Sequence, residues 1–195
     1  MSGETIYPTA WLKTPNMMDE KFKQLAKLGA ADFAHINGNL IDHLKGTRDI
    51  LTSWSASQTL QDAGLYHAVY GTSGFDAQMV APNHREKIAQ IIGVQAEEIV
   101  YQYCACDRDT VWPQLGLINN PDFKNRFTQQ TYRLNSELLN NFCELTVANE
   151  LEIALGSTAF VEQHGKSLYR LFSNMRPLLS SRANAAVKRV LGHYK

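Results

Sequence analysis

Apolar residues recur at helical intervals through the first half of the chain. Leu40, Leu44 and Leu51 are four and seven residues apart, so in a helix they share one face. The stretch from Thr59 to Tyr70 repeats this spacing and is followed by a glycine, a common helix stop. The pattern therefore predicts two consecutive antiparallel helices joined by a short polar turn near residues 55–57.

The same periodicity predicts helices on both sides of this pair. The expected segments are 17–29, 84–93, 94–104, 135–155, 164–179 and 181–191. Residues 73–83 are expected to form a loop whose Phe75 covers a pocket, residues 106–112 a charged turn, and residues 126–134 a short hairpin. Glycine and proline fall between the periodic segments. We therefore predict an all-α fold, a bundle of about seven or eight helices with one short hairpin.

Three parts are expected along the chain. Residues 1–16 are interrupted by Pro8 and Pro15 and are predicted to form an arm. Residues 17–156 form the main helical domain. Residues 157–195 form a helical extension that packs on the same domain. Its apolar residues are an alternative candidate for the contact surface of a homodimer.

Composition narrows the class of protein. The 195 residues carry no net formal charge, and 44% are hydrophobic, which suits a single packed domain. Basic residues gather only near the C-terminus, so no nucleic-acid partner is expected. Three cysteines without a disulfide pattern, no signal sequence and no long apolar run favour a cytoplasmic protein without a membrane partner.

Histidines supply the candidate chemistry. His43 and His67 are 24 residues apart across the predicted turn, which places their imidazoles at the same height on the two helices. His35 precedes His43 by eight residues, just over two turns, so both lie on one face if the helix already includes His35. Asn37 lies near the predicted start, where asparagine can act as a cap. Together His35, His43 and His67 suit Fe, Mn or Zn with open positions. The alternative is that these are core histidines bonded to backbone carbonyls.

The segment around His67 reads AGLYHAVYGT, and residues 35–47 read HINGNLIDHLKGT. The two histidines and their spacing resemble the HD superfamily of metal-dependent phosphohydrolases, with a distant likeness to the hydrolase domain of alarmone synthetase/hydrolases. The motifs are most similar to those of a small uncharacterised bacterial and fungal family, over roughly residues 20–155. The resemblance implies an HD-like bundle in which His43 and His67 are metal ligands.

The chain departs from the HD pattern at its acidic positions. The aspartate expected after the second histidine is Ala68, and the late ligand pair falls on Ala148–Asn149. The acidic pair of the alarmone hydrolases is replaced by Tyr70 and Gly71. Because alanine offers no ligand atom and asparagine only a neutral one, a standard two-carboxylate phosphohydrolase centre is not expected. The superfamily also includes iron oxygenases, so other metal chemistry stays open.

Further candidates surround the histidines. Arg108 is expected to bind an anion with its planar guanidinium, or else to form a surface ion pair with its acidic neighbours. Asn149 and Glu152 lie three residues apart and are expected to form the opposite pocket wall; the alternative is a solvated stripe that includes Glu144 and Glu150.

We assign Tyr70 and Glu152 as candidate catalytic groups, and Arg108, Asn149 and Thr72 as candidate ligand-binding groups. Cys104 and Cys106 would diverge on a helix and are expected to be inert. Two functions follow. The first is a metal-dependent hydrolase or oxygenase acting on a small anionic molecule. The second is a catalytically inactive HD-fold binding or regulatory protein.

Overall fold

The computed structural model describes residues 20–30, 34–35 and 38–194. Its helices are α1 Glu20–Lys27, α2 Leu40–Ser53, α3 Gln58–Tyr66, α4 Arg85–Ile92, α5 Val94–Ala105, α6 Arg108–Val111, α7 Ser136–Gly156, α8 Thr158–Asn174 and α9 Ser181–Leu191. Three 3₁₀ turns follow α6, α8 and α9: η3 Trp112–Gln114, η4 Arg176–Leu178 and η5 Gly192–Tyr194. Two small antiparallel pairs join β1 Ala34–His35 to β2 Gly38–Asn39 and β3 Phe123–Lys124 to β4 Thr131–Tyr132.

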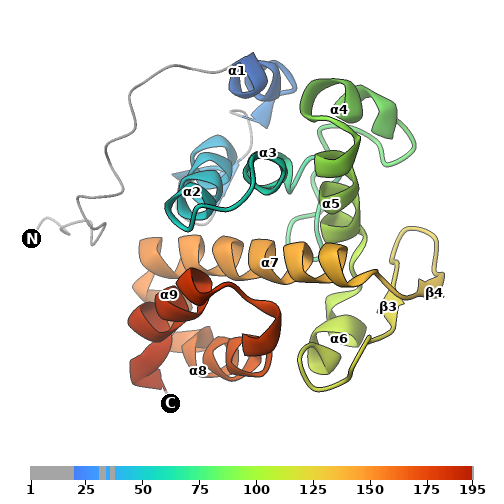
Figure 1. Ribbon diagram of the computed structural model, residues 1–195. Coiled ribbons are helices and arrows are strands. Elements are labelled where there is room, and N and C mark those ends of the chain that lie inside the picture. Colours follow the sequence, from blue (N-terminus) through green and yellow to red (C-terminus); the bar gives the residue numbers. More distant parts are fainter. Residues whose placement is uncertain (1–19, 31–33, 36–37, 195) are drawn as a thin grey trace, which may run out of the picture.

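Helix α7 runs through the middle of the molecule. Figure 1 shows α2, α3 and α5 on one side of it and α8 and α9 on the other, and α7 contacts all five. Residues 142–154 are buried without interruption, as expected for a helix covered on every face. The hydrophobic core is therefore arranged around α7.

Helices α2 and α3 form the expected antiparallel pair. The turn between them contains Ser55 in a left-handed conformation, with φ 56°. Ser57 then accepts a hydrogen bond from the backbone N–H of Leu60 and so caps α3. Leu40, Leu44 and Leu51 are all buried, as their spacing predicted. This pair packs on α7 and presents His43 and His67 toward it.

The predicted all-α class is confirmed, and a short hairpin is present. Three boundaries were wrong. The hairpin strands lie at 123–124 and 131–132, and residues 108–111 form a helical turn that Asp107 caps. Helix α8 begins at Thr158 and not at His164, because Ser157 accepts a hydrogen bond from the N–H of Phe160.

The start of α2 also differs from the expectation. Asn39 caps the helix through the N–H of Asp42, and Asn37 lies outside the described residues, as does the predicted arm at 1–16. The limits of the predicted main domain and extension stay predictions; α8 and α9 do pack on α7. Within the described ranges, no helix combines the length and apolarity that crossing a membrane requires.

The tie between α7 and α9 provides a test of this arrangement. The buried carboxylate of Glu144 accepts hydrogen bonds from the Ser180 N–H at 2.9 Å and the Ser180 hydroxyl at 2.5 Å, just before α9 begins. We expect Glu144→Ala to lower the free energy of unfolding by about 2 kcal/mol, because two donors lose their acceptor. Glu137→Ala removes an exposed carboxylate from the first turn of the same helix and should cost less than about 1 kcal/mol. Chemical denaturation measures both, and equal losses would contradict the proposed tie.

Candidate functional site

A cavity of about 140 Å³ lies where α2, the end of α3, α6, α7 and α8 meet. Its polar lining residues are His43, His67, Thr72, Arg108, Asn149 and Glu150, and its apolar ones include Leu40, Phe75, Ile153 and Phe160. A volume of this size holds on the order of five water molecules or one small ligand. Helices that are distant in sequence therefore bring these polar side chains together in one cavity, next to apolar side chains.

His43 is the centre of the polar group. It is 4% exposed, and its Nδ1 is hydrogen-bonded to the buried Glu152 carboxylate. Its Nε2 lies 3.2 Å from His67 Nε2 and 2.9 Å from Asn149 Oδ1. The expectation that the two imidazoles reach the same height is thus confirmed.

His67 follows α3 and is 1% exposed. Its Nδ1 lies 2.7 Å from the carbonyl oxygen of Gly64, a contact that requires Nδ1 to donate a proton. In the neutral ring, Nε2 then carries a lone pair directed at His43. The ring stands edge-on to His43, with centroids 5.1 Å apart, and edge-on to Tyr103 at 5.3 Å.

Asn149 is held in one orientation by its neighbour. Its Nδ2 donates to Glu150 Oε1 at 3.0 Å, which leaves Oδ1 facing His43. The same Glu150 oxygen accepts from Arg108 Nη1 at 3.1 Å, and Arg108 Nη2 donates to the hydroxyl of Tyr103 at 3.0 Å. The guanidinium also lies over the Trp112 ring, 4.7 Å from its centroid. The Arg108 side chain therefore reaches into the cavity, as one sequence interpretation expected.

His67 Nε2 and Asn149 Oδ1 thus converge on His43 Nε2. A proton on His43 Nε2 can satisfy this convergence, with Glu152 as the counter-charge. A cation can satisfy it as well, because neighbouring ligand atoms about 2.1 Å from a metal are about 3.0–3.4 Å apart, close to the observed 2.9 and 3.2 Å. Among the described residues, no group of three or more His, Cys, Asp or Glu side chains is placed to hold a metal ion. A metal here would need the Asn149 oxygen as its third protein ligand.

Residues 24–108 match the model of a family described as a domain of unknown function (DUF6817). No curated protein and no solved structure matches the chain. The matched region runs from within α1 to the first residue of α6, so it contains His43, His67, Thr72 and Arg108. It ends before α7, which supplies the remaining polar groups of the cavity.

Three of the predicted site residues differ in their position relative to the cavity. Thr72 lines the cavity and is 5% exposed. Glu152 is behind His43 and does not line the cavity, so it orients the imidazole and has no direct contact with a ligand there. Tyr70 does not line the cavity. Its hydroxyl donates to Glu97 at 2.8 Å, and burial, followed by that carboxylate, raises the pKa of Tyr70.

The helical-face argument for His35 was wrong. Residues 34–39 contain the β1–β2 pair, and α2 begins only at Leu40, so His35 is not on the His43 helix. Its backbone pairs with Gly38, and its side chain lies outside the described part of the structure. The third protein group beside the two histidines is Asn149, which the sequence placed in the pocket wall.

Glu150 lines the candidate site and was missed by the sequence interpretation. It appeared there only within a solvated stripe, but both Glu144 and Glu150 are buried. The signal available in the sequence was the number of polar residues within the otherwise apolar α7.

The Cys104 thiol donates a hydrogen bond to the carbonyl oxygen of His67 at 3.0 Å. Burial raises the pKa of Cys104 to about 12, so the thiol stays protonated at neutral pH.

The close approach of α2 to Glu152 can be tested through Gly46. A Cβ added at Gly46 would lie 2.9 Å from both Cγ and Oε1 of Glu152. Alanine ordinarily stabilises a helix interior by about 1 kcal/mol over glycine, but here it must displace the carboxylate from His43. We expect Gly46→Ala to give no stability gain and to shift or broaden the downfield proton NMR signal of His43 Nδ1–H.

A matched substitution controls for the added methyl group. A Cβ at Gly192 would lie 3.6 Å from Lys188 Cγ, an ordinary contact. Gly192→Ala should leave the His43 signal unchanged. An unaltered signal in Gly46→Ala would show that the carboxylate contact does not depend on the missing side chain at position 46.

Proposed function

We propose that the cavity is a divalent-metal centre of an HD-like helical protein, which acts as a hydrolase or oxygenase on a small anionic molecule. The observation that carries the proposal is the convergence of His43 Nε2, His67 Nε2 and Asn149 Oδ1. These three atoms would hold Fe, Mn or Zn. When bound, such an ion supplies Lewis acidity and an activated water.

Each proposed ligand is fixed by a second group. Glu152 orients His43, the Gly64 carbonyl fixes the tautomer of His67, and Glu150 directs the oxygen of Asn149. Metal-binding histidines in proteins ordinarily donate their other ring N–H to a carboxylate or carbonyl in this manner.

The charges of the cavity support an anionic ligand only when a cation is present. Glu150 and Glu152 place two carboxylates around the histidines, whereas Arg108 supplies one guanidinium. With neutral imidazoles the group is negative, and a divalent cation makes it positive. Arg108 uses some of its five donors on Glu150 and Tyr103, and the planar fork suits a carboxylate or phosphate.

One observation favours the alternative, a catalytically inactive binding protein. Ala68 forms part of the cavity wall at the position where the HD pattern has a metal-binding aspartate. The proposed ligands are therefore all neutral, which weakens binding of a divalent ion relative to a carboxylate-containing site. In that case the same pocket holds a small molecule without transforming it.

Metal content separates the two functions. We expect untagged protein, analysed by plasma mass spectrometry, to contain close to one equivalent of Fe, Mn or Zn. The double variant His43→Ala, His67→Ala should contain none, and Asn149→Ala should contain at least tenfold less at equilibrium. His84→Ala, which alters an exposed histidine outside the cavity, should match the wild type.

Folding must be checked in the same samples. Circular dichroism of each variant distinguishes a lost ligand from a lost fold. Metal-free wild type should also show a rise in melting temperature when one of these ions is added. A folded wild type that contains no metal, and whose melting temperature no ion changes, would overturn the enzyme proposal and leave the binding protein.

Arg108 gives a second test, with inorganic phosphate as the probe. We expect calorimetry to show phosphate binding to the metal-loaded protein and none to the metal-free protein, because the ion reverses the sign of the local charge. Arg108→Gln should weaken this binding at least tenfold, and Arg108→Lys should be intermediate because it keeps charge but loses the fork. Arg133→Gln changes an exposed arginine of the hairpin and should have no effect. Equal affinity in all four proteins would exclude Arg108 as the anion-binding group.

A further inference from the structure

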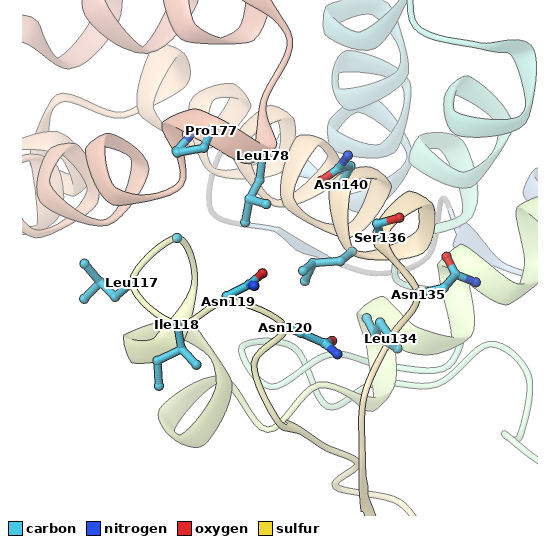
Figure 2. A pocket seen from close by; sticks show the side chains of 12 residues that line it. Leu117, Ile118, Asn119, Asn120, Leu134, Asn135, Ser136, Asn140, Pro177 and Leu178 are labelled. Atoms are coloured by element: carbon cyan, nitrogen blue, oxygen red, sulfur yellow. The ribbon is translucent and has the colours of Figure 1, made fainter.

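A second hollow lies on the opposite side of α7 from the α2–α3 pair. This groove of about 710 Å³ is bordered by residues 116–120, by the start of α7 and by η4. Leu134, Leu139 and Leu178 are among its apolar residues, and Asn119, Asn120 and Asn140 are among its amides. No charged residue lines it. Figure 2 shows Asn119 and Asn120 on the loop, Leu178 in η4 and Leu134 just before α7.

The loop beside the groove displays two aliphatic side chains to solvent. Leu117 is 65% exposed and Ile118 is 51% exposed, and in Figure 2 both point away from Leu134 and Leu178. The loop is held against the end of α8 by Gly116, where an added Cβ would lie 1.9 Å from the carbonyl oxygen of Asn174. With φ 73°, Gly116 also has a conformation that favours glycine. The base of this hydrophobic loop tip therefore packs against the end of α8.

The C-terminal helical layer is basic. Residues 157–195 contain seven lysines and arginines and one glutamate, although the chain as a whole is neutral. The six of these basic residues that the structure describes are exposed: Lys166, Arg170, Arg176, Arg182, Lys188 and Arg189. Arg176 immediately precedes Pro177 in the groove wall, and Arg170 is one turn before Asn174. Of these residues, Arg176 adjoins the groove wall, whereas Arg182 donates a hydrogen bond to Ser55 Oγ in the α2–α3 turn.

This combination of charge and apolarity discriminates among partners. A symmetric contact with a second copy would bring two basic layers together, which costs free energy. Nucleic acid would use the arginines but gains nothing from exposed leucine and isoleucine. A surface of anionic phospholipid satisfies both features, because its headgroups attract arginine and its acyl chains accept aliphatic side chains.

The geometry points to peripheral docking of this face on an anionic phospholipid surface. Leu117 and Ile118 enter the boundary between headgroups and acyl chains, and Arg170 and Arg176 contact lipid phosphates. The amides of the groove supply hydrogen bonds to headgroups beside the loop. The sequence alone suggested no membrane partner because it lacks a spanning segment, which peripheral docking does not require.

Vesicle sedimentation tests this docking with the full chain. We expect binding to vesicles of phosphatidylcholine with 30% phosphatidylglycerol at low salt, and at least tenfold weaker binding to phosphatidylcholine alone. Leu117→Asn with Ile118→Asn should weaken binding at least tenfold. Arg170→Gln with Arg176→Gln should weaken it about 25-fold, or about fivefold for each charge.

Matched variants control for surface chemistry elsewhere. Val94→Asn removes an aliphatic side chain that is 75% exposed at the start of α5, and Lys23→Gln with Lys45→Gln removes two exposed charges from α1 and α2. Both should bind vesicles like the wild type, and a loss equal to that of the groove-side variants would overturn the proposal.

Two other outcomes also overturn it. One is the absence of vesicle binding together with binding of a single-stranded oligonucleotide that depends on Arg170 and Arg176. The other is the absence of vesicle binding together with a dimer in sedimentation that Leu117→Asn with Ile118→Asn dissociates. None of these results depends on the metal centre, so the two proposals fail or succeed separately.

Discussion

The structure depends on partners for the carboxylates that are buried along α7, a helix covered by other helices on all sides. Helix α7 carries three buried carboxylates, and each has a partner on a different element. Glu144 accepts from the residue before α9, Glu150 from Arg108 of α6, and Glu152 contacts His43 of α2. Because an unpaired buried carboxylate is costly, these contacts fix where the surrounding elements sit relative to α7.

The candidate site is a product of the same constraint. One oxygen of Glu150 accepts hydrogen bonds from both Arg108 and Asn149, and so connects the arginine side of the cavity to the histidine side. Glu152 and the Gly64 carbonyl set the donor sides of the two rings, which leaves their Nε2 atoms facing each other. The orientation of the two imidazoles therefore depends on Glu152 and Gly64, which do not line the cavity.

Sequence reasoning was effective where local rules decide the structure. Helical spacing located the α2–α3 pair, and the 24-residue interval placed His43 beside His67, because both depend on helix rise and one short turn. It failed where tertiary contacts decide. Tyr70 is close to His67 in sequence, yet its hydroxyl is bonded to Glu97. Glu150 is buried against Arg108 of α6, and nothing in the sequence of α7 indicates this contact. His35 was misplaced because the spacing argument assumed that the helix already includes His35, whereas the helix begins after its cap, Asn39.

The span of the contacts at His43 has a consequence for the order of folding. Its contact with His67 closes 24 residues, whereas its contact with Glu152 closes 109. Loop closure costs more entropy for the longer span, and contacts between distant residues form slowly. The α2–α3 hairpin is therefore expected to form early, with the two imidazoles already near each other but without their carboxylate. The site becomes complete only when α7 docks, so a ligand that requires the complete site recognises a chain that has finished folding.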